Sequence, residues 1–209
     1  PILLIGATGP MGRAVLDRAV PDNTGTPVRA FARSPEALAD VGVDVVRGDV
    51  LDRDSLIDAL EGTSGVISVL GSRPTSKDAH LLEEGTANII AAMAETGIRR
   101  LVCVTGMGAG SSRGHGPWWY DRIVRPTILR GVYADKDRQE TLIREADLDA
   151  TIVRPAVLSD KPHSATVRAV VDLAPGEKMG SITRGDVADF LLAESLTGTH
   201  IGQTVHLFT

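Results

Sequence analysis

The stretch Ile2-Leu-Leu-Ile-Gly-Ala-Thr-Gly-Pro-Met-Gly12 decides the fold of this chain. A short apolar run leads directly into a string with glycine at every third position, and a segment of helical period follows. This order of strand, glycine turn and helix is typical of the first unit of a doubly wound sheet. The glycines permit a tight turn, a close approach of the backbone to a phosphate, and close packing of helix on strand. Because the N–H groups at the helix start attract an anion, the string predicts a dinucleotide diphosphate site.

The rest of the chain alternates between short apolar runs and longer segments of helical period. We expect strands near 1–5, 28–32, 43–47, 65–70, 100–105 and 149–154. We expect helices near 11–20, 53–61, 77–97 and 133–146, and a weaker one at 35–40. Gly97 stands where the C-terminal cap of the third helix should be. Beyond residue 154 we expect a small C-terminal extension on the same sheet, with a Val-rich stretch at 166–173, a helix near 184–197 and a strand near 203–208. The pattern predicts an α/β fold with a Rossmann-like, doubly wound parallel sheet.

Composition narrows the class of protein. The 209 residues, 43% apolar and 23% charged, suffice for one core, so we expect a single NAD(P)-binding domain over 1–209 in which 155–209 contributes the substrate side and the last strand. The net charge of −5 gives no general attraction for nucleic acid or an anionic membrane. Cys103 cannot form an internal disulfide and the start at Pro1 lacks a basic leader. We therefore expect a cytoplasmic monomer or homodimer with no nucleic-acid or membrane partner.

The end of the second expected strand distinguishes the two nicotinamide cofactors. An acidic residue there would favour NAD by binding the ribose hydroxyls. The chain instead places Arg33 and Ser34 at that position. Charge-assisted hydrogen bonds of this kind contribute about 1.5–3 kcal/mol, so the pair predicts NADP, with NADPH preferred over NADH. The alternative for Arg33 is a solvated side chain on a surface loop.

The ends of the third and fourth expected strands supply further candidates. Asp49 and Val50 are placed to bound the adenine, although Asp49 could equally cap the following helix. The turn Leu70-Gly71-Ser72-Arg73 should lie across the cofactor from the glycine loop. Arg73 there either pairs with a phosphate or faces solvent.

Six segments together resemble the atypical short-chain dehydrogenase/reductases, over essentially the whole chain. They are GATGPMG at 6–12, ARSPE at 32–36, GDVLDRDSL at 48–56, GSR at 71–73, LVCVTGMG at 101–108 and LDATIVRP at 148–155. Within that group the chain is similar to the NAD(P)H-binding proteins typified by flavin and biliverdin-IXβ reductase, and to the NmrA-like redox sensors. The resemblance implies a Rossmann-like fold and an NADP-type cofactor.

The resemblance also bears on the catalytic residues. Typical members place a Tyr four residues before a Lys, because a phenol with a pKa near 10 needs a neighbouring cation to pass a proton near neutral pH. Here Tyr133 stands three residues before Lys136, a spacing that still shares a helix face. The flavin and biliverdin type has a Ser and a His where this chain has Gly106 and Ala156. Lys136 falls where that subgroup has a helical His, which implies that it holds the nicotinamide ribose.

The predicted site residues fall into three groups, and no metal site is predicted because the five His show no ligand spacing. Lys136 and Tyr133 are predicted as catalytic. Met107, Trp118, Trp119 and Tyr120 are predicted to line the substrate pocket or a lid over it; the alternative is packing of this aromatic segment onto the core or a partner subunit. The predicted cofactor-binding residues are Gly6, Ala7, Thr8, Gly9, Pro10, Met11, Gly12, Arg33, Ser34, Asp49, Val50, Leu70, Gly71, Ser72, Arg73, Thr105, Gly106, Lys136, Pro155, Ala156 and Val157.

These residues lead to two hypotheses of different class. The first is an NADPH-dependent oxidoreductase that reduces a flavin-, quinone- or biliverdin-like conjugated acceptor, with Lys136 positioning the nicotinamide and Tyr133 or water as the proton source. Hydride delivery to such an acceptor needs mainly proximity and stacking, whereas an isolated carbonyl needs an acid in place. The second is a non-catalytic NADP(H)-sensing regulator of the NmrA-like type.

Overall fold

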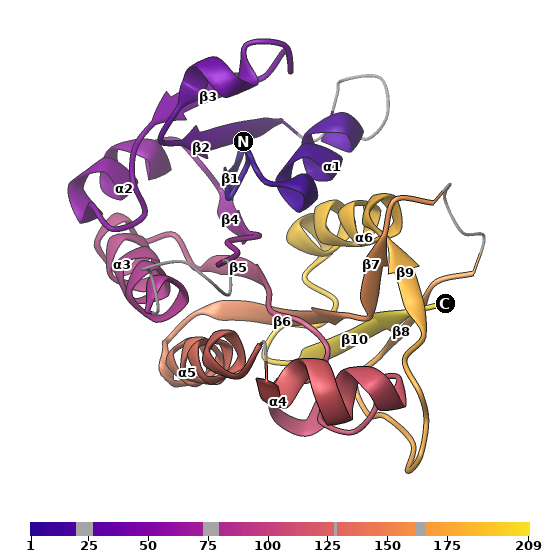
Figure 1. The fold of residues 1–209 in the computed structure, drawn as a ribbon. Coiled ribbons are helices and arrows are strands. Elements are labelled where there is room, and N and C mark those ends of the chain that lie inside the picture. Colours follow the sequence, from indigo (N-terminus) through magenta and orange to yellow (C-terminus); the bar gives the residue numbers. More distant parts are fainter. Residues whose placement is uncertain (20–26, 73–79, 128, 162–165) are drawn as a thin grey trace.

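The computed structural model describes residues 1–19, 27–72, 80–127, 129–161 and 166–209, and its centre is one sheet of eight strands (Figure 1). The strand order is β3-β2-β1-β4-β5-β6-β10-β8, and all neighbours are parallel except β10 and β8. The strands are β1 (Ile2–Ile5), β2 (Val28–Ala32), β3 (Asp44–Arg47), β4 (Gly65–Ser68), β5 (Arg100–Val104), β6 (Asp149–Pro155), β8 (Arg168–Val170) and β10 (Thr204–Phe208). The predicted Rossmann-like α/β fold is confirmed.

Helices cover both faces of this sheet, which explains why its central strands are apolar throughout. Ile2 and Leu4 of β1 pack into one core cluster, whereas Leu3 and Ile5 pack into the other, because successive strand side chains point to opposite faces. Helices α1 (Pro10–Ala19) and α6 (Arg184–Thr197) cover the first face; α2 (Arg53–Leu60), α3 (Leu81–Thr96) and α5 (Arg130–Glu145) cover the second. No helix in the described part of the chain is both long enough and apolar enough to cross a membrane.

The ends of the helices follow local capping chemistry. Helix α3 ends before Gly97, whose φ of 74° is left-handed, where the sequence predicts a glycine cap. Helix α2 begins after Asp52, whose side chain accepts a hydrogen bond from the Asp54 N–H at 3.2 Å. The capping role considered for Asp49 therefore belongs to Asp52.

The C-terminal extension departs in part from the prediction. Strands β10 and β8 extend the main sheet, but β7 (Val157–Ser159) and β9 (Ser181–Thr183) pair in a separate two-stranded sheet. A 3-10 turn, η1 (Pro35–Leu38), stands where a weak helix is predicted. Three further short elements follow β5: η2 (Gly110–Ser112), the π-helical η3 (Tyr120–Val124) and α4 (Arg125–Thr127). Elements of three to five residues are too short to show a hydrophobic period, so periodicity did not predict them.

The contact between α1 and β1 leaves no room at one glycine. A Cβ at Gly12 would overlap the carbonyl oxygen of Gly6 and the backbone of Ala7. At Gly9, by contrast, a Cβ would meet nothing nearer than the Gly6 oxygen at 3.4 Å, an ordinary contact. The helix therefore approaches the strand turn closely only because residue 12 has no side chain.

The substitution Gly12→Ala should lower the free energy of unfolding by about 1–3 kcal/mol, because the added methyl group displaces the start of α1. Gly9→Ala, on the same loop, should lower it by less than about 1 kcal/mol, because its Cβ has space. Urea denaturation of both variants measures the difference. Equal stability of the two variants would show that α1 does not need this close approach.

Candidate functional site

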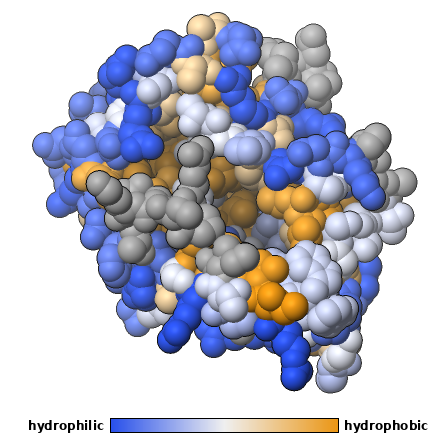
Figure 2. Space-filling view, viewed as in Figure 1, coloured by the Kyte–Doolittle hydropathy of each residue, from blue (hydrophilic) through white to orange (hydrophobic). Residues whose placement is uncertain are grey.

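A cavity of about 920 Å³ opens at the carboxyl ends of the parallel strands, where the strand order reverses between β1 and β4. Such a switch point is where open α/β sheets bind ligands. Figure 2 shows the hollow near the centre of this face, with hydrophobic residues in its walls. The lining residues come from several segments; they are Ile5, Gly6, Thr8, Gly9, Pro10, Met11, Phe31, Ala32, Arg33, Gly48, Asp49, Val50, Val69, Leu70, Gly71, Ser72, Leu81, Val104, Thr105, Lys136, Leu158 and Arg184.

The glycine loop and the start of α1 form one wall of the cavity. Gly6 has a φ of 86°, and a Cβ there would lie 2.8 Å from the carbonyl oxygen of Val69, so the loop passes close to the end of β4. Pro10 occupies the first position of α1, where a missing N–H costs nothing. The first turn of α1 carries no acidic residue. Its unpaired N–H groups and the positive end of the helix dipole therefore face the cavity without a competing carboxylate.

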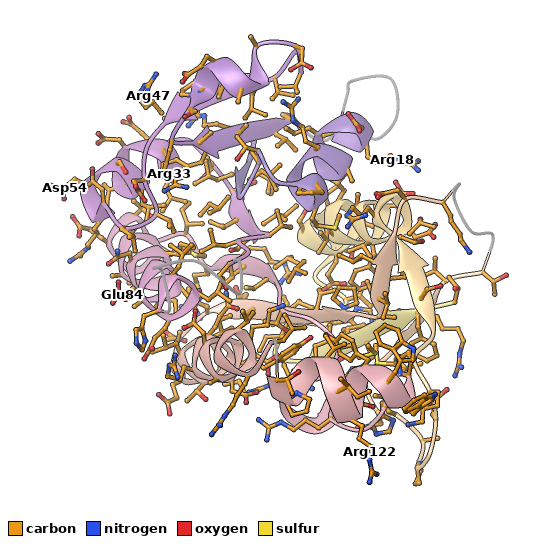
Figure 3. The ribbon with its side chains drawn as sticks, in the orientation of Figure 1. Arg18, Arg33, Arg47, Asp54, Glu84 and Arg122 are labelled. Carbon is orange, nitrogen blue, oxygen red and sulfur yellow. The ribbon has the colours of Figure 1, made fainter. Side chains whose placement is uncertain are left out.

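Arg33 and Arg47 lie beside β2 and β3 (Figure 3), and Arg33 lines that end of the cavity. Arg47 pairs with Glu36 at 3.2 Å and donates a hydrogen bond to the Arg33 carbonyl oxygen at 3.1 Å. Arg13 pairs with Asp40 at 3.1 Å. Arg33 lines the cavity and forms no ion pair with any residue that the structure describes. Among the described arginines named here, its charge is therefore the one without an acidic partner.

The adjacent loop after β3 is held by short-range hydrogen bonds. Asp49 Oδ1 accepts from the Leu51 N–H at 3.0 Å, and Ser55 Oγ contacts both the N–H and the carbonyl oxygen of Asp49 at 3.2 and 3.1 Å. A Cβ at Gly48 would overlap the ring of Phe31. The glycine thus allows this ring to lie against the loop, and both residues join the cavity wall.

Lys136 lies at the β5 side of the cavity. Its ammonium donates a hydrogen bond to the carbonyl oxygen of Thr105 and lies 5.5 Å from the centre of the Tyr133 ring. A Cβ at Gly106 would lie 3.0 Å from Lys136 Nζ, so the glycine leaves the space that the ammonium uses. Burial lowers the pKa of Lys136 to about 8. The cavity therefore presents an amine that changes charge slightly above neutral pH.

Tyr133 is placed differently from Lys136, because it does not line the cavity. Its buried hydroxyl donates to the carbonyl oxygen of Met107 and contacts the hydroxyl of Tyr120. Since a phenol has one proton, Tyr120 is the donor to Tyr133. Trp118 and Trp119 are 70% and 44% exposed and do not line the cavity either. Tyr133 and Tyr120 therefore connect the segment after β5 to α5.

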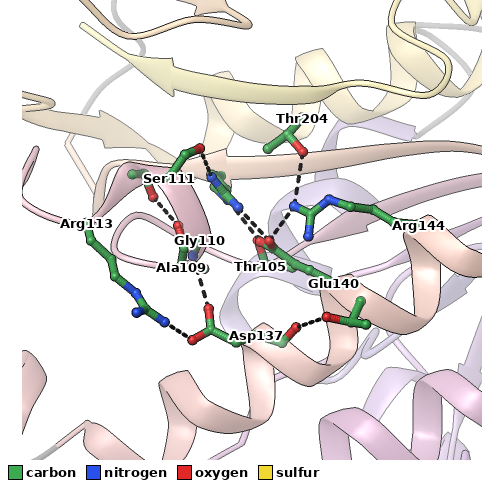
Figure 4. A network of polar contacts seen from close by, with 12 residues as sticks. Thr105, Ala109, Gly110, Ser111, Arg113, Asp137, Glu140, Arg144 and Thr204 are labelled. Atoms are coloured by element: carbon green, nitrogen blue, oxygen red, sulfur yellow. Dashed lines mark hydrogen bonds and ion pairs between the residues drawn. The ribbon is translucent and has the colours of Figure 1, made fainter. Parts of the chain in front are cut away.

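A buried ion pair connects β5, α5 and β6 next to Thr105 (Figure 4). Glu140 and Arg154 are both 1% exposed, and Arg154 Nε lies 2.9 Å from Glu140 Oε1. Thr105 Oγ1 and Arg144 Nη2 also donate to Glu140, each at 2.7 Å. Burial alone would raise the pKa of Glu140, but hydrogen bonds from Arg154 and Thr105 hold it below its usual value. Thr105 is thus held by Glu140 through its hydroxyl and by Lys136 through its carbonyl.

The same arginine orders the loop that follows β5. Arg154 Nη1 donates to Ser111 Oγ at 3.0 Å, and a Cβ at Gly110 would overlap the Arg154 guanidinium. The Gly110 N–H donates to Asp137 Oδ1 at 3.0 Å, and Arg113 pairs with the same carboxylate. The loop is therefore tied to both β6 and α5 beside Lys136.

The predicted residues fall into three groups by position. The cavity brings together Gly6, Thr8, Gly9, Pro10, Met11, Arg33, Asp49, Val50, Leu70, Gly71, Ser72, Thr105 and Lys136. Outside its lining lie Ala7, Gly12, Ser34, Gly106, Met107, Trp118, Trp119, Tyr120, Tyr133, Pro155, Ala156 and Val157. Arg73 lies outside the described residues.

Several lining residues were missed by sequence reasoning. Val104 precedes the predicted Thr105, and Phe31 and Ala32 precede Arg33, so the strand ends themselves were the available signal. Leu158 and Arg184 had no such signal. They reach the cavity through the pairing of β7 with β9, two strands of three residues each.

One cluster has the composition of a metal site. Ligand atoms of His80, Glu83 and Asp135 lie within 4.8 Å of one another. However, the buried Asp135 carboxylate accepts hydrogen bonds from the N–H groups of Leu82 and Glu83 at 3.0 and 3.2 Å. Arg138 pairs with both carboxylates and supplies the positive charge. The cluster caps the start of α3.

Comparisons with known proteins agree with this geometry. The profile of the NAD(P)H-binding family matches residues 6–196. The chain is 30% identical over 199 residues to the "Uncharacterized sugar epimerase YhfK" of Bacillus subtilis, which covers 92% of this chain and 86% of that protein. It is 32% identical over 197 residues to "Sterol demethylase protein B" of Methylococcus capsulatus, covering 83% of this chain and 57% of that protein.

A solved structure shares the whole architecture. ChuY of Escherichia coli O157:H7, described as an anaerobillin reductase, superposes with a TM-score of 0.82 at 25% identity, covering 100% of this chain and 96% of ChuY. The likeness agrees with the resemblance to the atypical short-chain dehydrogenase/reductases. Since the family profile covers most of its length, the chain belongs to the NAD(P)H-binding family.

Proposed function

We propose that this protein is an NADPH-dependent oxidoreductase that reduces a flavin-, quinone- or biliverdin-like conjugated acceptor. The observation that carries the proposal is one cavity that joins the glycine loop, the half-buried Lys136, and Arg33, which forms no ion pair with the described residues. Backbone N–H groups at a helix start, a guanidinium and an amine along one cavity match the diphosphate, the 2′-phosphate and the nicotinamide ribose of NADP(H). ChuY, described as a reductase, supports the same class of reaction.

The residues around the cavity fit this cofactor. Gly6 and Gly12 leave the space in which the loop turns, and the start of α1 would hold the diphosphate. Asp49 and Val50 would bound the adenine. The Lys136 ammonium donates to Thr105 and keeps further N–H donors for the ribose hydroxyls. When bound, the cofactor supplies the hydride.

The surroundings of Lys136 favour a conjugated acceptor over a simple ketone. Gly106 and Ala156 bring no acidic side chain, and the Tyr133 hydroxyl is engaged by Met107 and Tyr120. In this arrangement water, rather than Tyr133, supplies the proton. A flavin or quinone accepts a hydride without a fixed acid, whereas an aliphatic carbonyl does not. Apolar lining residues such as Leu81 and Leu158 offer surface for a flat ring system.

The same absence of an acid beside Gly106 and Ala156 favours a second candidate, an NADP(H)-sensing regulator that binds the cofactor without turnover. A turnover assay separates the two. Steady loss of NADPH absorbance with FMN, menadione or biliverdin, and little with cyclohexanone, supports the reductase. NADPH binding, measured by its fluorescence, without turnover on this panel supports the regulator. Absence of binding to either reduced nucleotide contradicts both.

Arg33→Gln should raise the KM for NADPH by about 10- to 100-fold and leave the KM for NADH unchanged, because it removes a charge-assisted hydrogen bond to the 2′-phosphate. Arg47→Gln is the matched control, since Arg47 is already paired with Glu36, and should change either KM by less than about threefold. Steady-state kinetics with both nucleotides gives these values. A parallel loss for NADH and NADPH in Arg33→Gln would contradict the assignment.

The value of kcat/KM for NADPH should fall as the pH rises through about 8, because the Lys136 ammonium is charged below its lowered pKa and neutral above it. Lys136→Met should lower kcat/KM by about 10-fold or more at neutral pH and should lose this limb of the profile. The control is Lys178→Met. Lys178 is exposed, and its ammonium also donates to a carbonyl oxygen, that of Gly114, at 2.6 Å. If kcat/KM of Lys136→Met still fell as the pH rises through about 8, another group would be responsible for the pH dependence.

A further inference from the structure

Arg184 is a charged cavity residue for which the proposed cofactor contacts give no role. It is the first residue of α6 and forms part of the wall of the main cavity. It also lines a second cavity of about 230 Å³ beside α1, in which Arg18 and Lys161 take part. Its side chain therefore stands at the boundary of two hollow regions, with space on either side.

The backbone that carries Arg184 is held firmly. Thr183 Oγ1 accepts a hydrogen bond from the Asp186 N–H at 3.1 Å and caps α6. Thr183 also pairs with Ser159 in the β7–β9 sheet, next to the cavity residue Leu158. The guanidinium thus projects from a fixed point beside an apolar wall, and only its long side chain has freedom to move.

The hydrogen-bonding capacity of Arg184 is only partly used. Nη1 pairs with Asp160, whose side chain is 84% exposed. Nε is shielded from solvent and has no hydrogen-bond partner among the described residues. An exposed ion pair contributes little free energy, so an arriving anion can share or replace Asp160 at small cost. A guanidinium with unused donors is suited to a planar or tetrahedral oxyanion.

We propose that Arg184 binds an anionic substituent, a carboxylate or a phosphate, of the acceptor. The rings of the acceptor lie in the main cavity against Leu158, and the substituent meets the guanidinium from the main-cavity side. The proposal rests on the proposed reductase function and adds a substrate class to it: conjugated acceptors that carry an oxyanion group. Arg33, at the β2 end, serves the cofactor, and Arg184, at the β7–α6 side, serves the acceptor.

The test uses two pairs of acceptors that differ in the anionic group: biliverdin with its dimethyl ester, and FMN with riboflavin. Arg184→Gln should weaken binding of biliverdin or FMN, or of both, by about 10-fold or more, and change that of the uncharged partner by less than about threefold. Affinity is measured by fluorescence titration with NADP⁺ present, and KM where turnover occurs. The first pair reports a carboxylate and the second a phosphate. Arg184→Lys, which keeps the charge but not the fork, should give an intermediate loss.

Arg18→Gln is the matched control, because Arg18 lines only the second cavity, where it pairs with Asp189 at 3.5 Å. It should change each affinity by less than about threefold. An equal loss for charged and uncharged acceptors in Arg184→Gln, or the same loss in Arg18→Gln, would overturn the proposal while leaving the reductase intact. If no acceptor is reduced, the proposed function fails, and the titrations still decide whether Arg184 distinguishes the charged partner.

Discussion

The buried pair between Glu140 and Arg154 is the interaction on which the rest of the site depends. Two charges removed from water cost several kcal/mol each, and only a complete set of partners offsets that cost. Here the Glu140 carboxylate receives hydrogen bonds from Arg154, Thr105 and Arg144. The pair therefore joins β5, α5 and β6 at one point. Lys136 stands one turn before Glu140 on α5, so its distance from the end of β5 is set by the same contact.

Gly106 and Lys136 form a complementary pair beside this contact. A side chain at residue 106 would meet the Lys136 ammonium at 3.0 Å, so the small residue and the long cation suit each other. In the subgroup that the sequence resembles, a Ser and a His stand at these positions. With Gly106 in place of the Ser and Lys136 in place of the His, a hydroxyl and an imidazole are replaced by a single amine. The proposed consequence is a site that orients a nicotinamide well and protonates an acceptor poorly.

The sequence predicted what depends on local geometry. The apolar β1, the glycine string and the cap at Gly97 each depend on neighbouring residues, and the structure has them where the pattern places them. Arg33 could be placed because it directly follows a recognisable strand. Lys136 was found through the family resemblance, since nothing in its own surroundings in the chain marks it.

The parts that were not predictable depend on contacts between distant segments. Leu158 and Arg184 reach the cavity because two strands of three residues pair across more than twenty intervening positions. Strands this short show no hydrophobic period, and no sequence motif predicts that they pair. Composition also drew attention to Trp118 and Trp119, which are exposed in the segment after β5 and do not line the cavity; their role at the acceptor stays a prediction.

The arrangement of arginines around the β2 end has a consequence for behaviour in solution. Arg13 and Arg47 are balanced by acidic neighbours, so this rim carries little surplus charge and does not concentrate polyanions in general. The proposed discrimination between the two nucleotides then relies on Arg33, which has no acidic partner among the described residues. At physiological ionic strength the Debye length is about 8 Å, so an exposed guanidinium acts on a phosphate only over short distances. Selectivity should accordingly weaken in concentrated electrolyte, while capture of the diphosphate by backbone amides at the start of α1 should persist.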